Sequence, residues 1–279
     1  MKNNKNTNIL KNINLLNQIF YFFVVLLLTN FLKPNVHAHE LWLEPINFKF
    51  DHKKLLKINI NIGQNFAGSP FGYYDPNKKK LYIENKDNGK NLTPRNGDFP
   101  AIQTSILDKG FHILNYETNY EFLKYESVEK FEDFLKEQNL QSAAGKFDKS
   151  KPPTESYRRF AKTLITDGDN NFFIQKPKLD FEIIALNSPY NSKNDLFKFQ
   201  IFEKGNPLGN WQITIFSKGD KNTYKEKIKT NLNGIGKIKV FEDRTYLLSA
   251  VKLNKTNYLE KLKYKSDWFS MWASLVFKK

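Results

Sequence analysis

The chemistry that this chain can support depends on its few histidines, because the sequence contains no cysteine. Without thiolates no disulfide can form, and any metal ion must be held by nitrogen and oxygen ligands. Three histidines follow residue 38, namely His39, His52 and His112. His52 lies in the basic segment Asp51-His-Lys-Lys54, and we expect it to be exposed. His39 and His112 are therefore the candidate metal ligands.

His39 gains its chemistry if the leader described below is removed, because it then becomes the first residue. A terminal histidine offers its α-amine and its ring Nδ1 to one ion, and an amine pKa of about 7.7–8 lets a metal displace the proton near neutral pH. A second imidazole, for which His112 is the candidate, would complete the three-nitrogen histidine brace. This donor set suits the tetragonal preference of Cu(II) and, less well, Ni(II).

Each candidate histidine also has a plainer interpretation. His39 could be the first residue of the mature chain only by an accident of where the leader is cut, without any role in metal binding. His112 could be a hydrogen-bonded histidine on a strand, sharing a face with Leu114 and Tyr116. Nothing in the spacing of residues 39 and 112 shows that the two rings meet.

Other catalytic signatures are missing from the sequence. There is no Gly-x-Ser-x-Gly nucleophile elbow, no P-loop and no dinucleotide fingerprint, since the Gly234-Ile-Gly236 segment lacks the third glycine. The spacing of the carboxylates does not single out an acid/base pair. We predict no catalytic residue and favour a non-enzymatic role, with the question of catalysis left open.

The N-terminus has the order of regions typical of a secretory signal peptide. Lys2, Lys5 and Lys11 precede the apolar run Ile19–Leu28, and Thr29 and Asn30 interrupt this run before it reaches the roughly 20 residues that span a membrane. Val36-His37-Ala38 fits the rule for small residues before the cut. We expect cleavage after Ala38, a periplasmic or secreted protein, and no stable membrane anchor afterwards.

The charge of the chain is strongly positive. Four of the 44 Lys and Arg residues lie in the leader, so the mature chain has 40 basic and 29 acidic residues and a net charge of +11. These lysines are interleaved with Asp and Glu, and Lys78-Lys79-Lys80 is the one tight cluster. The abundance of Lys, Asn, Ile and Phe indicates compositional drift, and we predict no nucleic-acid partner.

The first part of the mature chain, residues 39–177, has the pattern of a β-rich domain with two helices. Leu56, Ile58 and Ile60 alternate with polar residues as in a half-buried strand. Further short strands are expected at residues 80–84, 101–107 and 111–116. Ser127 could cap a helix near residues 127–139, and Thr154 a second one near 154–166, each with apolar residues at helical spacing.

From residue 178 to residue 279 the pattern is purely β. Short apolar segments separated by turns are expected to form strands at 179–184, 196–202, 211–216, 236–241, 245–251 and 273–277. This number and spacing is typical of an immunoglobulin-like sandwich. The sequence thus predicts a mainly β protein with two β-sandwich-like domains, the second immunoglobulin-like and the first carrying both helices.

Several segments together resemble the NikM-like periplasmic proteins, a family commonly described as the periplasmic component of cobalt or nickel transport. They occur in the same order over nearly the whole mature chain: Ala38–Pro45, Gly110–Tyr116, Phe131–Leu140, Glu155–Lys162 and Gly205–Leu208. The resemblance implies a secreted β-sandwich protein. It also implies a histidine at the mature N-terminus and another in the Gly-x-His strand, which are His39 and His112 here. The loop Lys146–Pro153 has fewer arginines than the family pattern.

These observations favour an exported metal-binding protein of the cell envelope, acting in metal uptake or delivery. Its ligand would be a divalent transition metal, with copper favoured over nickel and cobalt. The resemblance is compatible with an inner-membrane transporter as partner. Two alternatives remain open. The chain could be a β-sandwich scaffold or adhesion module without metal, or a copper-dependent oxidative enzyme that uses the histidine brace.

Overall fold

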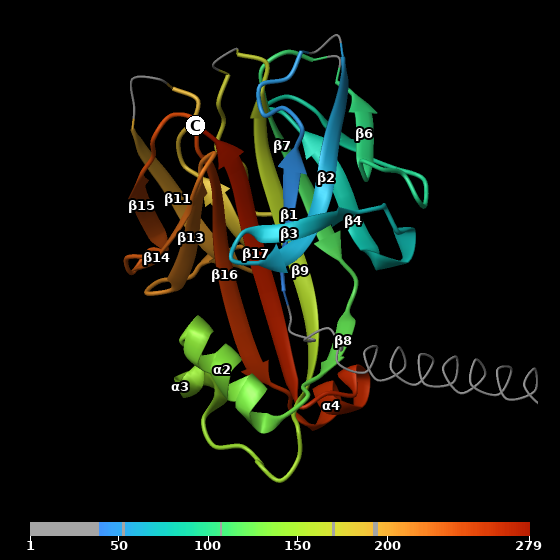
Figure 1. Cartoon of the computed structure of the whole chain (residues 1–279), viewed down its shortest axis with the longest axis vertical. Coiled ribbons are helices and arrows are strands. Elements are labelled where there is room, and N and C mark those ends of the chain that lie inside the picture. Colours follow the sequence, from blue (N-terminus) through green and yellow to red (C-terminus); the bar gives the residue numbers. More distant parts are fainter. Residues whose placement is uncertain (1–38, 52–53, 107, 169–170, 192–194) are drawn as a thin grey trace, which may run out of the picture. The chain divides into compact units, whose positions relative to one another are not determined.

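The computed structural model describes residues 39–51, 54–106, 108–168, 171–191 and 195–279, which fold mainly as β-sheets (Figure 1). The predicted leader, residues 1–38, and His52 lie outside the described residues. The described residues from His39 to Lys279 form one compact unit. No helix within the described ranges is both long and apolar enough to span a bilayer.

A nine-stranded sheet forms the centre of this unit. Its strands run in the order β14 (Thr223–Lys229), β13 (Gln212–Lys218), β16 (Thr245–Lys255), β17 (Trp268–Lys278), β9 (Thr154–Thr166), β7 (Phe111–Thr118), β4 (Lys78–Glu84) and β5 (Gly89–Asn91), and β8 (Glu121–Lys124) pairs with one end of β9. The β9 and β17 strands are parallel, with Phe160 opposite Ala273, whereas the other pairs are antiparallel.

A smaller sheet covers one face of the central sheet. It consists of β1 (Glu40–Pro45), β2 (Leu55–Gln64), β3 (Ala67–Phe71) and β6 (Ile102–Ser105). The alternation predicted around Leu56, Ile58 and Ile60 is confirmed, because all three side chains are buried. They pack with Leu114 and Ile165 of the central sheet, so this contact forms one of the hydrophobic cores.

The opposite face of the central sheet packs against a third sheet. This sheet comprises β10 (Phe181–Ala185), β11 (Leu196–Glu203), β12 (Asn206–Pro207) and β15 (Ile235–Lys239). Phe197 and Phe199 of β11 pack with Phe160 of β9 and Leu275 of β17 in the largest core cluster. The molecule therefore has three layers along much of β9, and this strand is buried on both faces.

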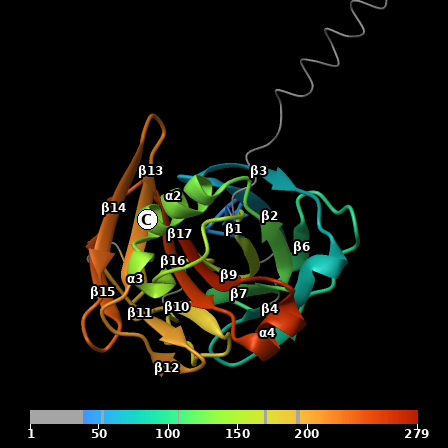
Figure 2. The same ribbon diagram turned by 90° about the horizontal axis from the view of Figure 1, so that it is seen from below.

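Helices cover the part of the central sheet that the first small sheet leaves open (Figure 2). In α2 (Val128–Gln138) the Ser127 hydroxyl accepts a hydrogen bond from the Lys130 amide, as the predicted N-cap requires. The α2 helix and the short α3 (Gln141–Ala144) pack on Trp268 and Trp272 of β17. A further helix, α4 (Tyr258–Tyr264), joins β16 to β17, and a short 3-10 turn spans Asp75–Asn77.

The second predicted helix, near residues 154–166, was a wrong prediction, because this segment is the central strand β9. Its apolar residues match helical spacing because the strand buries both faces: Phe160 and Leu164 point to one core, and Ala161 and Ile165 to the other. When both faces of a strand are covered, the period of two disappears from the sequence. The mainly β fold class itself is confirmed.

The central sheet takes strands from both sides of the boundary predicted at residue 178. The parallel pairing of β9 with β17 runs from Trp268 opposite Glu155 to Val276 opposite Thr163. The two halves of the mature chain thus share one sheet and one large core.

Thr163 tests the assignment of β9, because it lies outside the apolar face of the predicted helix and yet is fully buried in the strand. We expect Thr163→Lys to lower the free energy of unfolding by about 3 kcal/mol or more, since it buries an unpaired charge. Urea unfolding measures the change. Thr223→Lys, at an exposed position of β14, is the matched control and should change stability by less than about 0.5 kcal/mol. Equal stability of the two variants would contradict the assignment of residues 154–166 to a buried strand.

Candidate metal-binding histidines and the buried polar cluster

His39 lies half-buried immediately before β1, at a point fixed by Arg159 of β9. The Arg159 Nε donates to the His39 carbonyl at 3.1 Å, and the same guanidinium forms an ion pair with Glu121 at 2.7 Å. Its charge is further covered by the ring of Tyr157, whose centroid lies 4.5 Å from the guanidinium carbon. The cation beside His39 is therefore already neutralised.

Glu40 follows as the first residue of β1 and is buried. Burial, reinforced by the negative charge of Glu137, raises the pKa of its carboxyl to about 7, although Lys225 and Arg159 oppose the shift. A buried carboxyl that is partly protonated at neutral pH thus lies beside the predicted new N-terminus.

His112 lies on β7 and is 3% exposed. Its Nδ1 lies 3.2 Å from the Gly110 carbonyl, and the ring of Phe50 packs edge-on against it at 5.6 Å between centroids. Burial lowers the pKa of this histidine, so it is neutral at pH 7. The carbonyl partner places the proton on Nδ1 and leaves the lone pair on Nε2, which is the arrangement common in histidines that bind metals.

The structure does not bring His39 and His112 together. The carbonyl of His39 contacts Arg159, and the carbonyl of Leu41 accepts a hydrogen bond from Ser274, which lies opposite Ala161. His112 instead pairs with Ile165, six positions further along β9. At about 3.3 Å per residue this is about 20 Å, whereas two ligand nitrogens of one ion lie within about 4 Å of each other.

His112 borders a cavity of about 180 Å³ whose lining includes Glu84, Asn85, Ser105 and Asp108. Asp108 accepts a hydrogen bond from the Asn85 amide at 3.2 Å. Across the described part of the chain, no three His, Cys, Asp or Glu side chains lie close enough to hold an ion. Side chains alone therefore provide no complete metal site around either histidine.

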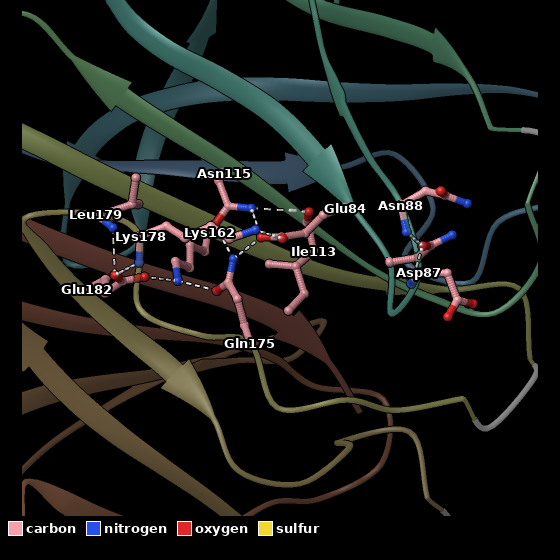
Figure 3. Close-up of polar contacts among 11 residues, drawn as sticks. Glu84, Asp87, Asn88, Ile113, Asn115, Lys162, Gln175, Lys178, Leu179 and Glu182 are labelled. Atoms are coloured by element: carbon pink, nitrogen blue, oxygen red, sulfur yellow. Dashed lines mark hydrogen bonds and ion pairs between the residues drawn. The ribbon is translucent and has the colours of Figure 1, made fainter. Parts of the chain in front are cut away.

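A buried polar cluster that sequence analysis missed lies between the central sheet and β10 (Figure 3). Its members are Glu84, Asn115, Lys162, Gln175 and Glu182, all at most 6% exposed, with Lys178 at its edge. The one sequence signal for it is Lys162, which lies between the core residues Phe160 and Leu164 on the same face of β9. That signal was hidden because the segment had the spacing of a helix.

The side chains of this cluster satisfy one another. The Lys162 ammonium binds the carboxylate of Glu182 and the carbonyl oxygen of Gln175, and burial, opposed by Glu182, lowers the pKa of Lys162. The other oxygen of Glu182 accepts two backbone N–H groups, from Lys178 and Leu179, at 2.6 Å each.

The amide of Gln175 continues the chain of contacts. It donates to Glu84 and, at 2.9 Å, to Asn115, and Lys178 pairs with the remaining oxygen of Glu84. Two cations and two carboxylates thus balance, and no member is left to activate a substrate. We assign the cluster a structural role, in which it joins β10 to the central sheet.

Arg158 and Arg159 lie on opposite faces of β9, and the neighbouring Glu155 has partners of its own. Glu155 is fully buried, and its carboxylate accepts hydrogen bonds from Tyr125, at 2.5 Å, and from Ser270. Arg158 pairs instead with Glu117 and with Asp180. The charges of both arginines are therefore balanced by carboxylates within the fold.

The Lys162–Glu182 pair gives a direct test of the cluster. Lys162→Met leaves a buried carboxylate without its cation, so we expect the free energy of unfolding to fall by about 3–5 kcal/mol. The double variant Lys162→Met/Glu182→Gln should regain most of that loss, because it removes both charges and keeps an oxygen for the Lys178 and Leu179 amides. Urea unfolding of the two variants, with Glu182→Gln alone, provides the cycle. Equal losses in the single and double variants would contradict a charge pair.

The neutral state of His112 predicts a dependence of stability on pH. The pKa of the folded protein is lowered and the unfolded value is about 6.5, so between the two the unfolded chain binds more protons. The stability that neutral His112 contributes is therefore complete above about pH 6.5 and is lost below it, at up to about 1.4 kcal/mol per pH unit. Unfolding measured from about pH 7 down to about pH 5 should show a steeper loss for the natural protein than for His112→Phe. Parallel curves would contradict the prediction.

Comparisons with known proteins place this chain in a family without indicating its activity. The profile described as "Domain of unknown function (DUF4198)" matches residues 36–252. No curated protein matches the sequence. Among solved structures, the chain is similar to the D0-D1 domain of intimin, at 10% identity over 86% of this chain and 98% of that one, with a TM-score of 0.19. A TM-score this low supports no inference about fold or function. Because the profile spans most of its length, the chain belongs to the DUF4198 family.

Proposed function

We propose that this protein is exported to the cell envelope and binds a divalent transition metal, most strongly Cu(II), through the amine and ring of His39. The observation that carries the proposal is the place of His39, directly before the first strand and tied to β9 through its own carbonyl. Removal of a leader after Ala38 would create a chelating terminus on a fixed backbone. The resemblance to NikM-like proteins supports a role in metal uptake or delivery.

A single residue, His39, supplies the first two nitrogen donors. The α-amine and Nδ1 of a terminal histidine close a chelate ring around one ion, and nitrogen donors of this kind follow an affinity order that peaks at copper. The remaining positions around the ion would be filled by water or by donors of a partner. Nickel and cobalt would occupy the same donors with lower affinity.

His112 is not a ligand of this ion in our proposal, because about 20 Å of β9 separates the contacts of the two histidines. This proposal departs from the three-nitrogen brace that the family resemblance implies. A site without His112 has one nitrogen ligand fewer than a complete brace, so its affinity for the metal should be lower.

A scaffold without metal is the second candidate. Two observations favour it: the histidines lie apart, and the described side chains contain no cluster of three metal ligands. The large shared core would serve a scaffold equally well. Copper binding by the exported protein distinguishes the two candidates.

The test begins with the intact mass of the exported protein, which should start at His39. Competition titration should then show that His39→Ala binds Cu(II) at least about tenfold more weakly than the natural protein, because the ring donor of the chelate is lost. His112→Ala is the matched control and should retain the natural affinity. Equal copper affinity of His39→Ala and the natural protein would favour the scaffold. If His112→Ala also binds Cu(II) more weakly, the three-nitrogen brace of His39 and His112 becomes the better proposal.

A further inference from the structure

The α4 helix differs from the other helices in what it exposes. None of its seven residues is buried, and Tyr258, Leu259 and Leu262 are 75%, 73% and 61% exposed. A helix in a soluble protein ordinarily buries its apolar side chains against the core. Large apolar residues that are exposed together indicate a surface that contacts something else.

The helix is held firmly, so this exposure is a feature of the fold. Asn257 and Glu260 form a capping box, in which each side chain accepts a hydrogen bond from the other's amide at 2.9 Å. The Tyr264 carbonyl accepts the hydroxyl of Ser156 at 3.0 Å, and Lys261 pairs with Asp267 at 2.6 Å. The capping box stabilises the start of α4, and the other two contacts attach its C-terminal half to β9 and to the residue before β17. The apolar side chains of the helix remain exposed.

Two more exposed aromatic side chains lie beside the helix. Tyr120, 44% exposed, packs against Tyr264 with 4.9 Å between ring centroids. Phe122, 56% exposed, pairs across the strands with Ser156, whose side chain reaches Tyr264. Residues paired across two strands point to the same face, so Phe122 lies on the side of the sheet that carries α4. Figure 1 shows β8 and α4 together at one end of the molecule.

Lysines surround these apolar side chains. Lys255, Lys261, Lys263 and Lys265 are exposed, whereas the one acidic residue of the helix, Glu260, is engaged in the capping box. Lys263 lies over the rings of Tyr120 and Tyr264, at 5.9 and 5.1 Å from their centroids. We call this surface the α4 patch: Tyr120, Phe122, Tyr258, Leu259 and Leu262 with the four lysines.

We propose that the α4 patch binds an anionic lipid surface. Protruding Leu and Tyr side chains can enter the boundary between headgroups and acyl chains, while the lysines reach the lipid phosphates. Each lysine near such a surface contributes about fivefold in affinity, so the excess of positive charge selects anionic over neutral lipid. Because Lys261 is paired with Asp267, the excess positive charge comes from Lys255, Lys263 and Lys265. A protein partner with an apolar groove would have no comparable need for this charge.

The patch is independent of the metal proposal, because none of its residues is a proposed metal ligand. The family profile covers Tyr120 and Phe122 but ends at residue 252, before α4 begins. Failure of copper binding would therefore leave the lipid proposal intact, and the converse also holds.

Co-sedimentation of the exported protein with vesicles tests the proposal. The natural protein should bind vesicles that contain phosphatidylglycerol and not vesicles of phosphatidylcholine alone. Leu259→Ser/Leu262→Ser should weaken binding to anionic vesicles at least about tenfold, because two membrane-inserting side chains are lost. Lys263→Gln/Lys265→Gln should weaken it about 25-fold.

The matched controls are exposed residues elsewhere on the molecule. Leu232→Ser, 80% exposed, and Lys198→Gln/Lys237→Gln, a cross-strand pair on β11 and β15, should bind as the natural protein does. Circular dichroism and urea unfolding should be the same for all variants, since every substituted side chain is exposed. Absence of binding to anionic vesicles, or equal losses in patch and control variants, would overturn the proposal. So would a patch-dependent dimer that does not bind vesicles.

Discussion

The structure depends on one strand, β9, which is buried on both faces and yet carries charged side chains. Unpaired burial of any one of them would cost several kcal/mol, so each requires a partner supplied by a different element. Glu121 of β8 pairs with Arg159, Glu117 of β7 with Arg158, and Glu182 of β10 with Lys162. Glu117 and Glu121 precede β9 in the chain, whereas Glu182 follows it, so β9 fixes the relative positions of strands from both halves of the chain.

The same burial explains which parts of the fold could be predicted from the sequence. The α2 helix has one covered face and one solvated face, so its apolar period and the Ser127 cap were both visible. Strand β2 alternates because one of its faces is largely polar. Strand β9 has no solvated face, and its buried Phe160, Ala161, Leu164 and Ile165 imitate a helical stripe. Local pattern could not separate the two interpretations, because the covering layers come from residues far away in sequence.

The candidate metal site was predictable only in part for a related reason. The residue types and the leader point to His39 without reference to the fold, because its chelating groups belong to one residue. The pairing of His39 with His112 was implied by the family resemblance. Whether the two rings meet depends on which residues of β9 each histidine lies beside. Register places His39 beside Arg159 and His112 beside Ile165, at different positions along β9. The buried cluster around Lys162 was missed because a lysine in a basic sequence is expected at the surface, and only the third layer, β10, supplies its carboxylate.

The arrangement along β9 also relates the two proposals to each other. Ser156, which holds the end of α4, precedes Arg159, which holds His39, by three positions, or about 10 Å of strand. Glu121, which neutralises Arg159, is the immediate neighbour of Phe122 in the α4 patch. His39 and the patch therefore belong to the same end of the central sheet, whereas His112 belongs to the other. If His39 binds a metal ion and lipid holds the α4 patch, as proposed, the ion is held near the membrane surface, within a short distance of any membrane transporter that takes or supplies it. Such an arrangement would need no second histidine, since the membrane would bring the acceptor to the ion.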